Sequence, residues 1–285
     1  ANMKNRKSKI IVNFFLWIIV AIVAVWMLFP FYWAVITSIK KPADVFQLSF
    51  IPGIQFDPTL DNWKSEFQLR GKEITRAMGN SLAIGIGAAL IALGIGTLAG
   101  YGLARFRYHR WSNKSMSMWI LSQRFLPPAA TVIPFFLIFK RIGLIDNVLA
   151  LILINTTFTI PFAVLILRDA FKEIPEEIEE SALVDGCSRF QAFIRMALPL
   201  VAPALVSAGI ICFSFAWNEF LFAFIMSYAK ASPMTVIIAG TQDTQGIQFW
   251  YVATRMLLAI VPPAILALTV QKYIVRGLTF GAVKG

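Results

Sequence analysis

Charged residues are scarce in this sequence: only 14% of the 285 residues are charged, whereas 58% are hydrophobic. The mean hydropathy of +0.70 excludes an ordinary soluble domain. Histidine occurs once, as His109, which excludes a histidine-rich metal site and H-E-x-x-H chemistry. Neither a G-x-S-x-G elbow nor a G-x-x-x-x-G-K-[ST] phosphate loop occurs. We therefore expect no catalytic residue, no metal site and no bound cofactor in this chain.

Cysteine is also scarce. Cys187 and Cys212 are the only two cysteines, which is too few for a disulfide framework. We expect both to be free thiols.

What the sequence has instead is long apolar segments. A helix needs about 20 apolar residues to cross a bilayer. Six segments reach or approach this length, and single charges at Arg124, Glu219 and Arg255 interrupt three of them. The six are residues 10–39, 77–104, 115–139, 147–167, 203–228 and 251–271. The predicted fold class is an all-α, polytopic membrane protein with six transmembrane helices.

Basic residues set the predicted orientation. Four cations precede the first span, and residues 105–114 carry four cations and no acid. The positive-inside rule places both segments, and therefore both termini, in the cytoplasm. The formal net charge of +11 then needs no nucleic acid as a partner. In this orientation residues 40–76 form an outer loop that contains a short amphipathic helix at 62–68. The apolar run of the first span is longer than that of a signal peptide, so we expect it to be a retained transmembrane helix.

Two features of the spans concern packing and polarity. Gly85 with Ala89, and Gly96 with Gly100, put small residues on one helix face, which favours close helix packing. Pro127 and Pro128 should break the third span. Arg124 and Glu219 lie deep in their spans, where charge is costly. They either pair with each other or line a polar passage.

Seven of the fifteen acids lie between residues 169 and 185, in the second cytoplasmic loop. Pro175 and the glutamates after it predict a helix that ends at Asp185-Gly186, and Ser188 can cap a second helix. Phe190, Phe193, Ile194 and Ala197 follow at helical spacing and form an apolar stripe. The pair is either a knob that docks on a soluble partner or an interfacial helix pair on lipid. Its acids favour docking, because they suit an anionic membrane surface poorly.

These residues resemble the "EAA" loop of binding-protein-dependent ABC importers. Glu180, Ser181, Ala182, Asp185 and Gly186 match it at the same spacing, followed by Phe193 and Pro199. The segments "FAWNEFLFA", "RFLPP" and "RGLTFGAVKG" are similar to maltose-type carbohydrate permeases.

The resemblance implies a type I importer fold, with a core permease domain at 77–271 that contains the coupling loop at 169–203. An N-terminal region, 1–76, precedes the core, and a cytoplasmic tail, 272–285, follows it. The chain would form half of a sugar path in the bacterial inner membrane. Its partners would be a second permease subunit, two ATPase subunits that bind ATP and Mg, and an extracytoplasmic sugar-binding protein.

The same resemblance assigns residues to roles. The EAA residues would hold the coupling loop, and Phe190 and Phe193 would pack into the ATPase. The tail would reach the ATPase through Gly281, Val283, Lys284 and Gly285, and the candidates for the substrate path are Arg124, Trp217, Asn218 and Glu219. Because Arg124 is a cation, an anionic sugar remains open as the substrate, although a structural ion pair explains Arg124 as well. Two other functions remain open: an ion-coupled secondary transporter that uses Arg124 and Glu219, and a membrane anchor that recruits a soluble protein.

Overall fold

The computed structural model describes the backbone of residues 2–240, 242–243 and 246–279, and the side chains of residues 12–240 and 246–271. It divides into two compact units, residues 1–71 with 238–258, and residues 72–237 with 259–285. We describe each unit by itself.

The first unit is built around helix ends. It contains α1 (Asn2–Ser38), η1 (Pro42–Asp44), the start of α2 (Asp61–Arg105), the two-stranded ladder of β1 (Gln242–Asp243) and β2 (Gly246–Ile247), and the start of α12 (Phe249–Thr279). The amide of Asn62 donates to the carbonyls of Ser38 and Lys40, at 2.9 and 2.7 Å. Arg255 and Glu66 form a buried ion pair at 2.5 Å, which satisfies the charge that interrupts the last span.

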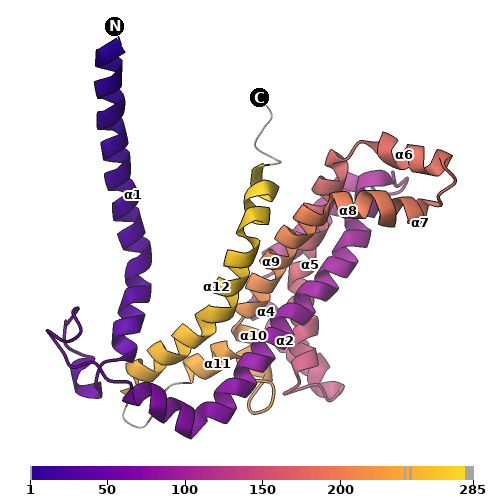
Figure 1. Cartoon of the computed structure of the whole chain (residues 1–285). Coiled ribbons are helices and arrows are strands. Elements are labelled where there is room, and N and C mark those ends of the chain that lie inside the picture. Colours follow the sequence, from indigo (N-terminus) through magenta and orange to yellow (C-terminus); the bar gives the residue numbers. More distant parts are fainter. Residues whose placement is uncertain (1, 241, 244–245, 280–285) are drawn as a thin grey trace. The chain divides into compact units, whose positions relative to one another are not determined.

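The second unit holds most of the helices (Figure 1). They are α3 (Asn113–Ser122), η2 (Gln123–Phe125), α4 (Pro128–Arg141), α5 (Val148–Glu173), α6 (Glu176–Val184), α7 (Arg189–Ala192), the π-helical turn η3 (Phe193–Ala197), α8 (Leu198–Leu200), α9 (Ala202–Trp217), α10 (Leu221–Met226) and most of α11 (Met234–Ala239).

Within the described residues, four helices are long and apolar enough to span a membrane, and two bent pairs raise the number to as many as six. One pair, α3–η2 with α4, bends by 89° at Pro127-Pro128, as the sequence predicted. The other bend, of 73°, lies between Leu200 and Ala202. The expected fifth span corresponds to α9 and α10, which are separated by a short break. Length and composition therefore agree with six spans.

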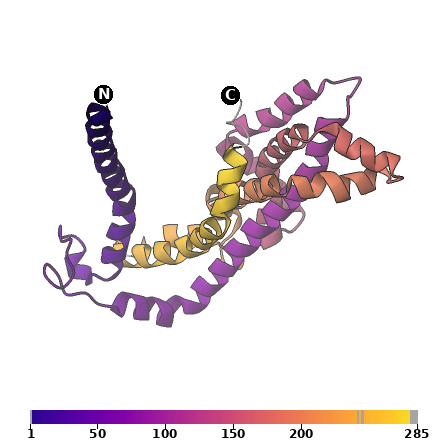
Figure 2. The ribbon, with the colours of Figure 1, turned by 45° about the horizontal axis from the view of Figure 1, so that its top comes forward.

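The separate helix predicted at residues 62–68 is wrong. These residues are the first turns of α2, which runs without interruption for 45 residues (Figure 2). No proline lies between residues 61 and 105, so nothing removes a backbone donor and breaks the helix.

Small residues on α2 allow close packing against α5. A Cβ added at Gly96 would lie 2.5 Å from the Cβ of Ala163, and one at Gly100 would lie 2.9 Å from the backbone nitrogen of Arg168. Side chains cannot be accommodated at such distances. The predicted small-residue face is confirmed, and it fixes α2 against the helix that leads into the acidic loop.

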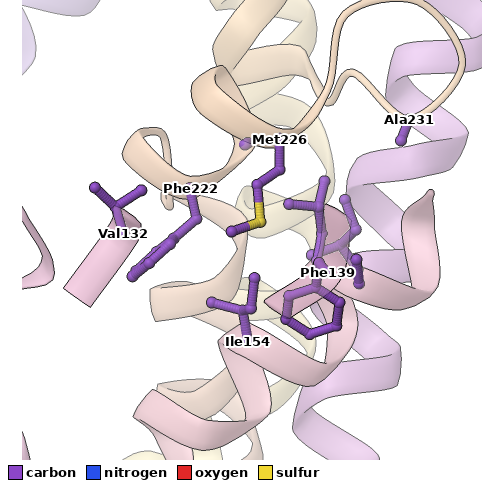
Figure 3. Close-up of a cluster of buried hydrophobic side chains, with 10 residues drawn as sticks. Val132, Phe139, Ile154, Phe222, Met226 and Ala231 are labelled. Atoms are coloured by element: carbon purple, nitrogen blue, oxygen red, sulfur yellow. The ribbon is translucent and has the colours of Figure 1, made fainter. Parts of the chain in front are cut away.

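A second buried cluster joins α4, α5 and α10. Val132 and Phe139 of α4 meet Ile154 of α5 and Phe222 and Met226 of α10 (Figure 3).

The chain that follows α10 is held by one carboxylate. Asp146 accepts hydrogen bonds from the consecutive backbone amides of residues 228–231, at 3.0–3.2 Å. Burial acts to raise the pKa of Asp146, but these amides outweigh it and hold the pKa below its usual value.

Candidate functional site

The acidic loop folds as two short helices joined by a tight turn, and α6 and α7 lie at one end of the second unit (Figure 1). Pro175 lies one residue before α6, and Gly186 has the positive φ of +90° that ends it. The hydroxyl of Ser188 accepts from the amide of Gln191, whose side chain accepts from the amide of Ser188. This capping box starts α7. The predicted helix–turn–helix is therefore confirmed.

One acid of α6 faces inward. Glu179 is buried, and its carboxylate accepts from Nε of Arg105 at 2.7 Å and from the hydroxyl of Tyr101 at 2.5 Å. Arg105 also donates to the carbonyl of Ile174 at 3.0 Å. Charge-assisted hydrogen bonds of this kind are stronger than neutral ones, so they fasten α6 to the last turn of α2.

Sequence reasoning missed this pair. In the sequence, Arg105 is one of four cations that indicate the membrane orientation, and Glu179 is one of several acids that favour a helix N-terminus. The available signal was spacing: Glu179 lies three residues before Ala182, on the face that the structure buries.

The aromatic stripe of the second helix divides between two environments. Phe193 is buried, with its ring centroid 4.6 Å from that of Tyr101 and 6.1 Å from that of Phe171. Phe190 remains 66% exposed, and Val184 is 87% exposed. The expectation that Phe193 packs into a partner is therefore wrong, because Phe193 fills a cavity of its own chain. A π-turn at 193–197 follows, a distortion often found at functional sites.

The other predicted loop residues have distinct places. Glu180, Ser181, Asp185, Gly186 and Pro199 are exposed, whereas Ala182 is buried. The hydroxyl of Ser181 donates to the carbonyl of Glu177, at 2.7 Å. The loop thus presents acids on its outer face and packs its small residue inward.

Arg124 and Glu219 do not form the ion pair that the sequence left open. The guanidinium of Arg124 lies over the rings of Phe162 and Phe215, at 4.2 and 4.8 Å, and donates to the carbonyl of Phe158 at 3.1 Å. It therefore lies against α5 and α9 rather than beside an acid.

Glu219 has a different partner. Its carboxylate accepts from the backbone amides of Phe222 and Ala223, at 2.9 and 3.2 Å, and so caps the first turn of α10. The space beside it has no room for a water molecule. Trp217 is buried against Phe213, and Asn218 is exposed.

Two further predictions have different outcomes. Both cysteines are free, Cys212 buried and Cys187 partly exposed. The tail residues Gly281, Val283, Lys284 and Gly285 lie outside the described residues. Among the described residues, no group of three histidine, cysteine or acidic side chains could hold a metal ion.

The fold and the loop define a polytopic, α-helical membrane protein with a structured helix–turn–helix connection. A family model described as "Binding-protein-dependent transport system inner membrane component" matches residues 92–280. The chain belongs to this family, and it is therefore a permease subunit of a binding-protein-dependent ABC importer.

Relatives and a solved structure agree with this assignment. The trehalose transport system permease protein SugB of Mycobacterium tuberculosis is 35% identical over 90% of this chain and 93% of its own length. The trehalose/maltose transport system permease protein MalG of Thermococcus litoralis is 30% identical over 93% and 94%.

A bacterial ABC transporter involved in the import of the acidic polysaccharide alginate has a chain of the same fold. The TM-score is 0.72 at 23% identity, and the likeness covers 96% of this chain and 98% of that one. The predicted type I importer fold is thereby confirmed.

Proposed function

We propose that this chain is one of two permease subunits of an ATP-driven carbohydrate importer and forms half of its translocation path. The family assignment supports transport, and the names of the trehalose and maltose permeases support a carbohydrate as the solute. The second permease subunit would be a homologue of different sequence, so that the pair is a heterodimer.

The main observation in support of a coupling role is that one face of the acidic loop packs against helices of its own chain, whereas the other face is exposed. Glu179, Ala182 and Phe193 attach the loop to its own helices, whereas Val184 and Phe190 are exposed on either side of the turn at Gly186. Exposed apolar side chains on a rigid tip suit insertion into a groove of a soluble partner. An ATPase subunit that moves this tip would also move α2 and α5.

The chain itself would hydrolyse nothing. ATP and Mg would be bound by two partner ATPase subunits, and no cofactor would be bound here. An extracytoplasmic sugar-binding protein would deliver the solute. Among the residues proposed for the path, Asn218 is exposed and Arg124 is partly exposed, whereas Trp217 is buried and Glu219 caps α10. We therefore propose Asn218 and Arg124 as solute contacts, and Trp217 and Glu219 as residues that shape the wall of the path.

The proposed location is the bacterial inner membrane with both termini in the cytoplasm. In this orientation α6 and α7 would lie at the cytoplasmic side, and the region of residues 1–76 would supply the first span and the outer loop. Contact of the tail, residues 272–285, with the ATPase is part of the same proposal. An ion-coupled transporter is less well supported, because Arg124 and Glu219 have separate partners. The family assignment disfavours a simple membrane anchor.

The substitution Gly186→Asp tests the coupling role. The φ of +90° costs a non-glycine residue about 1–2 kcal/mol, and no neighbouring atom lies within 4 Å of an added Cβ. The turn should therefore distort while the helices remain folded. We expect the assembled importer to lose solute uptake and to retain or raise its ATPase activity.

The matched control is Gly79→Ala, an exposed helical glycine with no neighbour within 4 Å of an added Cβ. It should leave uptake and ATPase activity unchanged. Normal uptake by the Gly186→Asp importer would show that this turn does not couple ATP hydrolysis to transport.

A further inference from the structure

The cytoplasmic ends of α3 and α5 enclose a groove that is lined by none of the residues proposed above for coupling or for the solute path. It has a volume of about 440 Å³. Three cations line it, Lys114 from α3 and Arg168 and Lys172 from α5, and no acid does. The rest of the lining consists of the polar Asn113 and Ser117 and the apolar Met118, Leu121 and Leu165.

The positive charge of this groove is only partly neutralised. Arg168 forms a bidentate contact with its neighbour Asp169, at 2.8 and 2.9 Å. Lys114 and Lys172 are exposed, and neither takes part in an ion pair among the described residues. Lys114 also lies in the first turn of α3, where the helix dipole adds partial positive charge. Both lysines are therefore available to an anion, although Lys172 also borders a neighbouring hollow that Glu173 and Glu176 line.

The groove lies at the depth of a membrane interface. Tyr108 and Trp111, which precede α3, are 47% and 57% exposed. Exposed tyrosine and tryptophan beside a span are typical of the headgroup level. Met118 and Leu121, further along α3, then lie at the depth of the acyl chains. A basic rim above an apolar floor complements a molecule with an anionic head and an apolar tail.

We infer that this groove binds an anionic glycerophospholipid, with its phosphate between Lys114 and Lys172 and its acyl chain along Leu121 and Leu165. The inference rests on the proposed function in one respect, the cytoplasmic placement of this end of α5. Basic grooves between helices on that side of the membrane suit anionic headgroups. A lipid held there would bridge α3 to the end of α5 that leads into α6.

The test measures lipid binding to the full chain purified in a neutral detergent. Native mass spectrometry would compare phosphatidylglycerol with phosphatidylcholine of the same acyl chains. The double substitution Lys114→Gln/Lys172→Gln removes the two free cations. Because a basic residue near an anionic surface contributes about fivefold to affinity, the loss of two should weaken the binding of phosphatidylglycerol about 25-fold and leave the binding of phosphatidylcholine unchanged.

The matched control is Lys140→Gln/Arg141→Gln, which removes two exposed cations from the C-terminal turn of α4, where they do not line the groove. It should leave both lipid affinities unchanged. Both lysines of the groove are exposed, so the Lys114→Gln/Lys172→Gln chain should unfold thermally at the wild-type temperature in neutral detergent.

Three results would overturn the inference. The first is equal affinity of the wild type for phosphatidylglycerol and phosphatidylcholine. The second is an equal loss of phosphatidylglycerol affinity in the groove variant and in the control variant. The third is full displacement of phosphatidylglycerol by soluble glycerol 3-phosphate, which would indicate a site for a free phosphate. The measurement needs no ATPase, sugar or binding protein. Its outcome is therefore independent of the uptake experiments, and a failure of the lipid proposal can be told apart from a failure of the proposed transport function.

Discussion

Nε of Arg105, in the last turn of α2, lies 2.7 Å from a carboxylate oxygen of Glu179 in α6, and both side chains are at least 90% buried. This pair connects the long α2 helix to the loop that we propose as the coupling element. The hydroxyl of Tyr101 completes the contact. A force on the loop would therefore reach α2 directly, without passing through α5.

We predict that Arg105→Met destabilises the chain, because it leaves the Glu179 carboxylate buried without its cation. Breaking one partner of a buried pair costs about 3–5 kcal/mol. The double variant Arg105→Met/Glu179→Leu should recover much of this loss, since no uncompensated charge remains. Thermal unfolding of the wild type and the two variants in detergent measures the stability, and solute uptake by the assembled importer measures coupling. If the double variant is restored in stability and also in uptake, the pair has no coupling role.

The two phenylalanines of the loop should respond in opposite ways. Phe193→Ala opens a cavity beside Tyr101 and Phe171, and a buried Phe→Ala change costs about 3–5 kcal/mol. Phe190 is mostly exposed, so Phe190→Ala should leave the unfolding temperature of the chain unchanged but weaken its association with the ATPase. Co-purification of the ATPase with each variant checks this, and Arg189→Ala, also exposed, serves as the neighbouring control. Equal ATPase binding by wild type and Phe190→Ala would exclude Phe190 from the interface.

Asp146 should make the stability of the chain depend on pH in the acid range. Its folded-state pKa is lowered, so its contribution is fully present above the unfolded value of about 3.9 and is lost as the pH falls toward the folded value. Asp146→Asn should reduce stability at pH 7 and flatten the dependence below about pH 4. Thermal unfolding as a function of pH measures both effects. Asp57→Asn, at an exposed carboxylate that pairs with Lys41, is the control. If Asp146→Asn loses thermal stability below about pH 4 as steeply as the wild type does, Asp146 is not the source of this pH dependence.

Arg124 and Glu219 should act independently. They share no hydrogen-bond partner, since one contacts Phe158, Phe162 and Phe215 and the other caps α10. Residues without shared partners usually show additive effects to within about 0.5 kcal/mol. A double-mutant cycle of Arg124→Gln and Glu219→Gln on thermal stability should therefore give a coupling energy near zero. A large coupling energy, together with uptake that survives ATP depletion in energised vesicles, would support the ion-coupled alternative.

The sequence by itself determined the class of the protein, the apolar spans, the break at Pro127-Pro128 and the turn at Gly186. These features follow from local chemistry: apolar length sets a span, proline removes a backbone donor, and glycine reaches positive φ. The small face of α2 was also predictable, because Gly96 and Gly100 share a helix face through their spacing alone.

Only the tertiary structure decided which polar side chains are paired and which aromatic ones are free. Arg105 and Glu179 are 74 residues apart in sequence, and Glu66 and Arg255 are 189 apart. Periodicity cannot reveal such partners, because it describes one helix and not the neighbour against which that helix packs. The same reason separates Phe190 from Phe193: both belong to one apolar stripe in sequence, but only Phe193 meets the ring of Tyr101.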